Sequence, residues 1–332
     1  MSMTETDERR VALIGMGSAF AAAAIFSVND GAIKFLSGGY ALHQLVLIRS
    51  VIALGVLMIV VLPFVGGLRN LRTARPGLHL MRGGLVVVSN LCFFLSLAVL
   101  PIATSVALFF VAPLLITALS VVILGETVGP RRWAAVIVGL MGVVVMLRPG
   151  MAAFQPAMLL PLCAALAYAL MHMLTRRMAS SESAATMTIY VQLMFIATSA
   201  VMGVIAGHGG FAGDADQGAL TFLLRGWHWP DAADWPILAT IGLASAFGAL
   251  LMAQAYRLCE AAMVAPFEYV NMPLAILLGL LIFGEWPDAL AWVGITLICG
   301  SGLYMLWRET RVQKPLISAL APTPDAPIRL AD

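Results

Sequence analysis

Long apolar segments, separated by short polar ones, follow one another along almost the whole chain. A membrane-spanning helix needs about 20 mostly apolar residues, because the hydrocarbon layer is about 30 Å thick and a helix rises about 1.5 Å per residue. A helix also satisfies its own backbone hydrogen bonds, which no water does inside that layer. The pattern therefore predicts an all-α integral membrane protein with ten transmembrane helices, over residues 11–33, 42–63, 82–99, 103–124, 133–148, 156–175, 184–206, 236–257, 261–283 and 289–307.

Composition agrees with that pattern. Of the 332 residues, 61% are apolar and only 11% are charged, whereas an average soluble domain carries about 25% charged residues. A net charge of +2 gives no reason to expect a nucleic-acid partner. The chain contains no P-loop and no known cofactor or metal-ligand motif, so we expect no cofactor, no metal and no direct use of ATP.

The distribution of basic residues predicts the orientation, because Lys and Arg collect in cytoplasmic segments. With a cytoplasmic N-terminus, ten alternating spans place all 19 basic residues on the cytoplasmic side except Lys34, Arg49, Arg148 and Arg225. We therefore expect a multi-pass protein of the cell inner membrane with both termini in the cytoplasm.

The two halves of the chain carry the same landmarks in the same order. The matching pairs are Pro113 and Pro273, Glu126 and Glu285, and Trp133 and Trp292. Each half holds five predicted spans, an odd number, so the second half enters the membrane from the opposite side. Such inverted repeats are typical of secondary transporters, which bind cargo near the membrane midplane. We predict an N-terminal cytoplasmic tail, two repeats and a disordered cytoplasmic tail over residues 1–10, 11–148, 156–307 and 308–332.

Several runs carry a family resemblance. The strongest are the run that ends in Gly125-Glu126-Thr127 and the second-half run AMVAPFEYVNMPLAILLGLLIFGEWPD. With them, residues 11–310 resemble the EamA type of the drug/metabolite transporter superfamily. The segment 27–30, SVND, followed by Lys34 and Arg49, resembles the subgroup that holds S-adenosylmethionine carriers. The resemblance implies a ten-helix secondary transporter, and related members carry riboflavin or export amino acids.

Polar side chains inside the predicted spans are the candidates for cargo binding, because burying them in a membrane is costly. Asp30 and Lys34, four residues apart on one helix, can pair. A cargo-binding or proton-exchanging carboxylate and a structural ion pair are both open. Arg49 is expected to face a polar cavity or an acid such as Asp30 or Glu268. The complete predicted set is Asn29, Asp30, Lys34, Arg49, Asn90, His172, Gln254, Tyr256, Glu268, Tyr269 and Asn271.

The richest polar cluster lies in the ninth span, where Glu268, Tyr269 and Asn271 stand between Pro266 and Pro273. Proline weakens a helix, and broken helices with polar groups are typical binding sites in transporters. The same side chains also suit hydrogen bonds between helices, so a purely structural use of this cluster stays open.

Three other ionisable residues receive weaker assignments. The repeat places His172 opposite Asp30, where a hydrogen-bonded structural histidine is the commoner use and a titrating one the alternative. Glu126 and Glu285 each follow a glycine at the end of a span. We expect them to cap helices rather than to bind cargo.

These observations predict a secondary transporter, not an enzyme, that moves a small organic metabolite by alternating access. The resemblance favours S-adenosylmethionine-like cargo and leaves riboflavin carriage or amino-acid export open. The alternative from another class is a membrane-embedded lipid-modifying enzyme, which needs a convergent acidic or histidine cluster that the sequence does not show. The expected partners are the small-molecule cargo, the lipid bilayer and, in one version, a coupling proton. The sequence leaves the oligomeric state open.

Overall fold

The computed structural model describes residues 5–61, 63, 73, 75–124, 129–149, 155–178, 184–211, 218–258 and 268–320. Within these ranges the regular elements are helices, and none is a strand. The first half of the chain supplies α1 (Glu5–Leu36), α2 (Leu42–Val56) with a following π-helical turn (Leu57–Val61), α3 (Pro76–Val99), α4 (Ile102–Phe109), α5 (Ala112–Leu124) and α6 (Pro130–Leu147). The second half supplies a 3-10 turn (Pro156–Met158), α7 (Leu159–Met178), α8 (Ala184–Ala206), α9 (Ala219–Leu224), α10 (Trp235–Leu258), α12 (Asn271–Phe283) and α13 (Ala289–Leu320).

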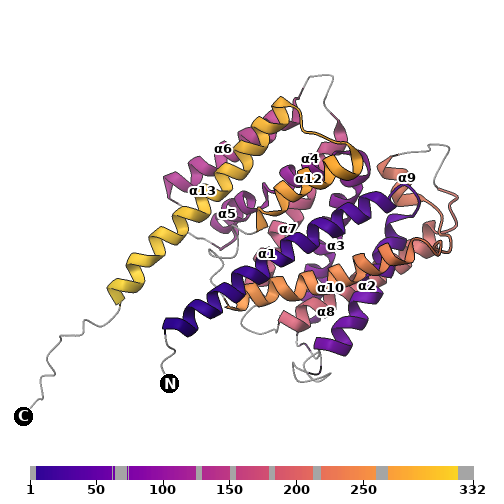
Figure 1. Cartoon of the computed structure of the whole chain (residues 1–332), viewed down its shortest axis with the longest axis horizontal. Coiled ribbons are helices and arrows are strands. Elements are labelled where there is room, and N and C mark those ends of the chain that lie inside the picture. Colours follow the sequence, from indigo (N-terminus) through magenta and orange to yellow (C-terminus); the bar gives the residue numbers. More distant parts are fainter. Residues whose placement is uncertain are drawn as a thin grey trace, which may run out of the picture.

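Each predicted span contains a described helix. Eight helices in the described ranges are long and apolar enough to cross a membrane, and Asn271–Phe283 and Ala289–Met305 are shorter apolar helices. The prediction of an all-α, multi-pass membrane protein is therefore confirmed. Figure 1 shows the long helices running in roughly one direction, with the start of α1 and the last turn of α13 at the same end of the bundle.

The fourth predicted span consists of two helices rather than one. α4 ends at Phe109, and α5 begins at Ala112 after a turn at Phe110 and Val111. Pro113 then lies in the first turn of α5, where its missing N–H removes no helical hydrogen bond. The second half repeats this arrangement, because a turn precedes α12 and Pro273 lies in the first turn of that helix.

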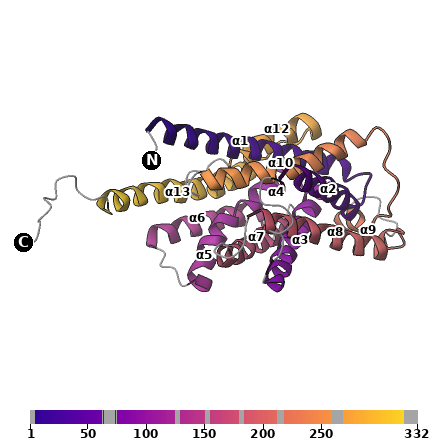
Figure 2. The ribbon, with the colours of Figure 1, turned by 90° about the horizontal axis from the view of Figure 1, so that it is seen from below.

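The helices pack in pairs drawn mostly from different halves of the chain. α1 lies along α10, α3 along α7, α6 along α13, and α2 along α8. α1 also contacts α12, and α7 contacts α5. Figure 2 shows α1 and α12 on one side of the bundle and α5 and α7 on the other. The interior therefore lies between the two halves, where their side chains meet.

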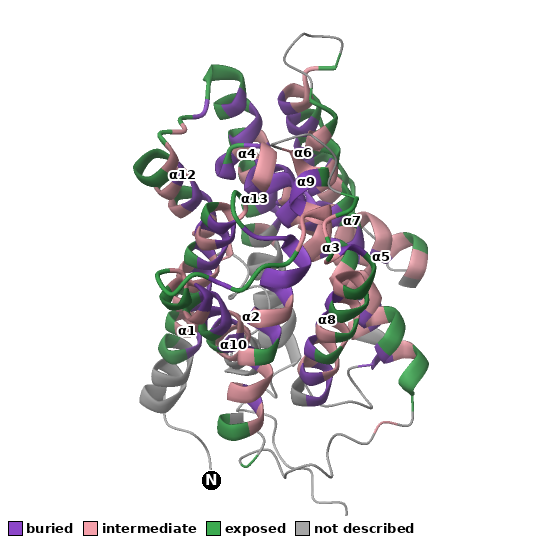
Figure 3. Cartoon of the chain, turned by 90° about the vertical axis from the view of Figure 1, so that its right-hand side faces the viewer, coloured by how far each residue is buried: buried purple, intermediate pink, exposed green. Residues whose placement is uncertain are grey.

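Burial follows this packing. Large side chains between the helices, such as Leu45, Leu97 and Leu108, are fully buried. Outward faces carry exposed apolar side chains, with Val122 81% and Val204 85% exposed. Figure 3 shows buried faces turned inward and exposed faces turned outward. Apolar exposure on this scale is unfavourable in water and suits contact with lipid tails.

Glycines let α6 and α13 approach closely. A Cβ added at Gly142 would lie 3.0 Å from the carbonyl oxygen of Gly294, and one added at Gly294 would lie 3.0 Å from that of Gly142. Small residues at such crossings bring helix backbones together in membranes. At the chain ends, α1 begins at Glu5 and α13 continues to Leu320, so helix extends into both segments that the sequence assigned to tails.

Candidate functional site

Four polar side chains meet where α1 approaches the start of α12, and we call them the acidic cluster. Ser27 donates a hydrogen bond to Oδ1 of Asn271, and Asn29 Nδ2 donates one of 3.2 Å to Asp30 Oδ1. Asn271 also lies beside the Asp30 carboxylate. Ser27, Asn29 and Asp30 are all buried. Because Ser27 and Asp30 are three residues apart on a helix, they share one face of α1, and that face meets α12.

Arg49 of α2 is buried between aromatic rings, in what we call the arginine cluster. Its guanidinium carbon lies 5.1 Å from the ring centre of Phe94 on α3 and 5.2 Å from that of Phe195 on α8. Its Nη2 donates a hydrogen bond of 3.3 Å to Asn90 Oδ1, while Nε is buried without a partner. Contacts with ring faces hold a guanidinium in place, and its N–H groups lie in the guanidinium plane.

The acidic and arginine clusters act on each other through charge. Asp30 and Arg49 interact electrostatically, yet the two described side chains form no direct ion pair. Removing two charges from water is costly, and direct contact with good geometry is what repays the cost. Arg49 was expected to face a cavity or an acid such as Asp30 or Glu268. In the structure it lies close enough to Asp30 for the two charges to interact.

A third polar group, which we call the α7 cluster, consists of Tyr168 and His172 of α7 together with Glu268. Tyr168 lies edge-on to His172 with ring centres 4.4 Å apart, and it interacts electrostatically with Glu268. Phe109, the last residue of α4, packs against Tyr168 with ring centres 5.3 Å apart. His172 thus joins the site through Tyr168, and its expected position opposite Asp30 stays a prediction.

Tyr269 makes the contacts of a packing residue. It is 6% exposed, and its ring lies 4.9 Å from that of Phe110. Its hydroxyl is buried without a partner and lies against Gly302 of α13, where an added Cβ would come within 1.9 Å of it. The side chain therefore fills the space between the end of α4 and α13.

Lys34, near the C-terminal end of α1, pairs with Glu285 rather than with Asp30. Its Nζ lies 2.6 Å from Glu285 Oε1 and 2.6 Å from the carbonyl oxygen of Leu100. Glu285 Oε2 also accepts a hydrogen bond of 3.1 Å from the backbone N–H of Ile102. The expected capping role of Glu285 is confirmed, and the helix that it caps is α4. The pairing of Asp30 with Lys34 is not formed because two other acceptors hold the ammonium group.

The connector between α8 and α10 packs over the α1–α2 turn. Arg225 Nη1 donates hydrogen bonds of 2.8 and 3.2 Å to carbonyl oxygens of that turn. Tyr40 donates one of 2.5 Å to Asp234 Oδ2, and Gln44 Nε2 donates one of 2.6 Å to the carbonyl oxygen of His228. Burial, with a smaller effect of the Asp234 carboxylate, raises the pKa of Tyr40, so its hydroxyl remains a donor.

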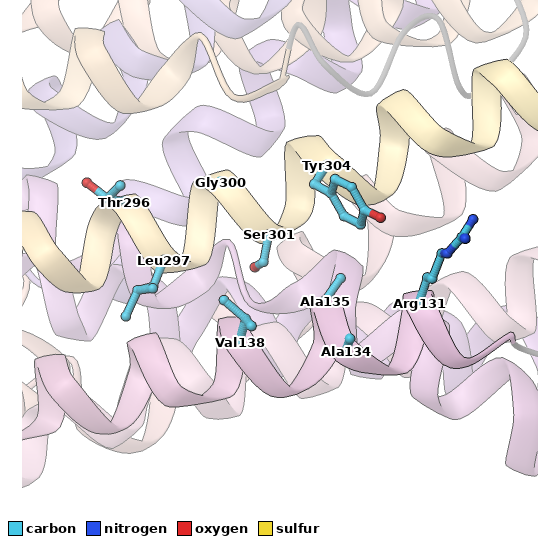
Figure 4. Close-up of a pocket in the computed structure, with 9 residues that line it drawn as sticks. All are labelled: Arg131, Ala134, Ala135, Val138, Thr296, Leu297, Gly300, Ser301 and Tyr304. Atoms are coloured by element: carbon cyan, nitrogen blue, oxygen red, sulfur yellow. The ribbon is translucent and has the colours of Figure 1, made fainter.

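A groove of about 400 Å³ lies apart from these clusters, between α6 and α13. Figure 4 shows Thr296, Ser301 and Tyr304 of α13 along one wall and Val138 of α6 on the other. Val138 and Tyr304 are exposed at the bundle surface. The groove therefore opens on the outward face of the bundle, and none of the residues that line it belongs to the three clusters.

The three clusters contain most of the predicted cargo-binding residues. Gln254 and Tyr256 belong to α10, but their side chains fall outside the described part of the chain, as does the whole of Glu126. Phe94 and Phe195 were not predicted, because phenylalanine is ordinary inside a membrane span. Asn90 and Phe94 lie four residues apart and so share one face of α3. This spacing is the sequence signal that links Phe94 to the predicted residue Asn90. No pattern along the chain connects Phe195 with Arg49.

Comparison with protein families gives one match over most of the chain. The sequence profile of the EamA-like transporter family matches residues 13–148 and 155–307. A crystal structure with 20% sequence identity superposes with a TM-score of 0.60, covering 92% of this chain and 99% of that chain. At that identity the structural likeness shows a shared fold.

Three relatives with named activities are transporters. The riboflavin transporter of Vibrio cholerae serotype O1 is 30% identical over 82% of this chain and 87% of its own. The S-adenosylmethionine uptake transporter of Rickettsia prowazekii is 26% identical over 86% of this chain and 90% of its own. A pseudopaline exporter of Pseudomonas aeruginosa is 24% identical over 82% of this chain and 89% of its own.

Proposed function

Because this chain belongs to the EamA-like transporter family, we propose that it is a secondary carrier that moves a small organic metabolite across the membrane by alternating access. One observation carries the mechanism: charged and polar groups from both matched segments meet inside the bundle, including the buried Asp30 and Arg49 and the half-buried Asn271. Charge inside a membrane is costly, and ionisable groups there typically mark a cargo or ion pathway.

The carrier has ten spans arranged as two inverted repeats, 11–148 and 156–307. Eight long helices and two shorter apolar ones support that number. The packing is consistent with a two-fold relation, since α1 with α10 corresponds to α7 with α3, and α1 with α12 corresponds to α7 with α5. The matching turns before Pro113 and Pro273 give each repeat an interrupted helix, which is typical of transporter binding sites.

Both termini lie on the cytoplasmic side of the inner membrane. The start of α1 and the last turn of α13 share one end of the bundle (Figure 1). Segments predicted to face outward meet at the other end, through Lys34 with Glu285 and Arg225 with the α1–α2 turn. The small number of basic residues in the outward segments supports this orientation.

The contacts at this outer end form the closed gate of the carrier. Lys34 and Glu285 join α1 to the segment after α12, and the Glu285 carboxylate also holds the start of α4. The connector residues Arg225 and His228 cover the α1–α2 turn. In an alternating-access cycle these contacts break when the site opens outward, and cargo then reaches Asp30 and Arg49.

The cargo is an S-adenosylmethionine-like metabolite. The acidic cluster suits a cation, and the nearby rings of Phe94, Phe109 and Phe195 suit a flat aromatic group or a sulfonium. Riboflavin is the second candidate, favoured by the 30% identical relative. Asp30 and Glu268 are acids of the site that can exchange a coupling proton with either side.

Counterflow in sealed proteoliposomes tests the proposed function. Vesicles are preloaded with S-adenosylmethionine, riboflavin or an aromatic amino acid, and the same compound is added outside in radiolabelled form. The variants are Asp30→Asn and Glu268→Gln, with Asp231→Asn as the matched control because Asp231 is exposed at the surface. An imposed pH gradient separates proton-coupled flux from exchange.

We expect accumulation of one cargo, lost in Asp30→Asn and kept in Asp231→Asn. No flux of any of the three compounds would contradict the proposed carrier for these cargo classes. Flux that persists in both Asp30→Asn and Glu268→Gln would place the cargo site elsewhere in the bundle.

A further inference from the structure

Arg49 presents more hydrogen-bond donors than the protein satisfies. A guanidinium carries five N–H groups, and the described contacts pair one of them, with Asn90 at 3.3 Å. Nε has no partner although the residue is only 4% exposed. Phe94 and Phe195 occupy the ring-stacking positions at 5.1 and 5.2 Å. A ligand must therefore meet the edge of the guanidinium, which is the geometry by which arginine holds a carboxylate with two parallel hydrogen bonds.

The acidic cluster has the opposite deficit, because it contains a buried acceptor without a partner, Oδ1 of Asn29. Asp30 is 8% exposed, and its carboxylate accepts a hydrogen bond from Asn29 and lies beside the amide of Asn271. The amide nitrogen of Asn29 is committed to that bond, and its Oδ1 is buried without a partner. A carboxylate and an amide oxygen side by side suit a donor with several N–H groups and a positive charge, as in an ammonium.

A structural ion pair does not account for this arrangement. The free-energy cost of burying an ion pair is offset by direct contact between the two charges and by hydrogen bonds to their remaining donors and acceptors. Asp30 and Arg49 influence each other electrostatically without touching. The buried Nε of Arg49 has no hydrogen-bond partner, and neither has the buried Oδ1 of Asn29, the residue next to Asp30. Unpaired groups of this kind cost free energy in the empty protein and are satisfied by a ligand of matching polarity.

We propose that this site recognises the α-amino-acid moiety of the cargo, with its carboxylate on Arg49 and its ammonium on Asp30 and Asn29. The inference rests on the proposed carrier function and narrows its cargo. A zwitterion matches one buried positive and one buried negative group, so the α-amino-acid moiety itself adds no net charge to the site. The isoalloxazine and ribityl groups of riboflavin carry neither end of that pair, so the site favours amino acids and their conjugates.

Analogues that lack one end of the zwitterion test this on the unaltered protein. Competition against labelled S-adenosylmethionine is measured with the intact compound, its decarboxylated analogue, its deaminated analogue and riboflavin, both as binding in detergent and as counterflow. We expect each truncated analogue to bind at least about 100-fold more weakly, because a site built for a polar group rejects a ligand without it.

Two variants assign the ends. In the detergent binding assay, Arg49→Gln should abolish the loss of affinity caused by removing the carboxylate and keep the loss caused by removing the ammonium. Asp30→Asn should do the reverse in the same assay. Arg131→Gln and Asp231→Asn, at exposed positions, are matched controls and should keep the full ranking. The analogue series on the unaltered chain decides the question even if the Arg49 variant fails to fold.

The outcomes separate the two proposals. Counterflow of riboflavin without competition by any amino-acid compound would overturn the zwitterion site and leave the carrier standing. Equal binding of the intact and truncated analogues would do the same. Absence of counterflow for every compound would overturn the carrier proposal for these cargo classes and the inference with it.

Discussion

The ring of Phe110, directly after α4, packs against the ring of Tyr269, two residues before the start of α12, with ring centres 4.9 Å apart. The two residues belong to the turns that precede Pro113 and Pro273. The turn that interrupts the helix in one matched segment therefore packs against the corresponding turn of the other segment. A change at either ring is expected to disturb both turns at once.

Tyr269 gives the first prediction. Tyr269→Phe removes a buried hydroxyl that has no partner, so thermal unfolding in detergent should show unchanged or slightly raised stability, by less than about 1 kcal/mol. Tyr269→Ala should lose about 3–5 kcal/mol, because it leaves a cavity where an aromatic ring was. A loss of cargo affinity in Tyr269→Phe at unchanged stability would instead place the hydroxyl in contact with cargo.

The α6–α13 crossing gives the second prediction. In Gly142→Ala the new Cβ would lie 2.8 Å from Leu297 Cβ and 3.0 Å from the backbone oxygen of Gly294, so overpacking should cost about 1–3 kcal/mol. Gly300→Ala is the matched control, since nothing lies within 4 Å of its Cβ position. The control should gain up to about 1 kcal/mol from helix propensity. Equal effects of the two changes on the unfolding temperature would contradict the close contact.

Asp288 gives the third prediction, at the start of α13. Its Oδ1 accepts a hydrogen bond of 2.8 Å from the N–H of Ala291 and also pairs with Arg148 at the end of α6. Asp288→Ala should cost about 1 kcal/mol for the lost cap, whereas Asp288→Asn keeps the cap and should cost less. The exposed ion pair itself is expected to add little, because solvent screens it.

The pH dependence of Asp288 follows from the same contacts. The hydrogen bond from Arg148, with that from Ala291, lowers the pKa of Asp288 below its ordinary value of 3.8. A lowered pKa in the folded state means that the carboxylate contributes stability above pH 3.8 and loses it as the pH falls further. Unfolding temperatures measured between pH 3 and pH 6 should fall less in Asp288→Asn than in the unaltered chain. A parallel fall in both would contradict the assignment.

The spans were predictable because a membrane demands a fixed length of apolar helix, and each predicted range contains a described helix. The division of the fourth span was missed because its turn at Phe110 and Val111 contains no proline or glycine. The partner of Lys34 was missed for a different reason. Asp30 lies one helical turn away, whereas Glu285 lies 251 residues away, and only the packing of α1 with the second half selects between them.

The Lys34–Glu285 contact gives the last prediction, which concerns the gate. Glu285→Gln keeps an oxygen to accept from the N–H of Ile102 but removes the charge opposite Lys34, whose side chain is only 11% exposed. The uncompensated ammonium should cost about 1–3 kcal/mol. If this contact closes the outer end, its loss should also shift the carrier toward the outward-open state.

The shift is measured by alkylation of a cysteine that replaces Ser105, in a chain without its native cysteines. Ser105 is fully buried in the first turn of α4, beneath the end that Glu285 caps. A membrane-impermeant thiol reagent added outside should label it faster in Glu285→Gln, while Asp288→Asn, at the same end, should leave the rate unchanged. An unaltered rate in a folded Glu285→Gln protein would mean that the pair only stabilises the bundle. A faster rate together with altered counterflow would make the 2.6 Å contact between Lys34 and Glu285 a gate, because a merely structural pair changes stability without exposing the interior to one side.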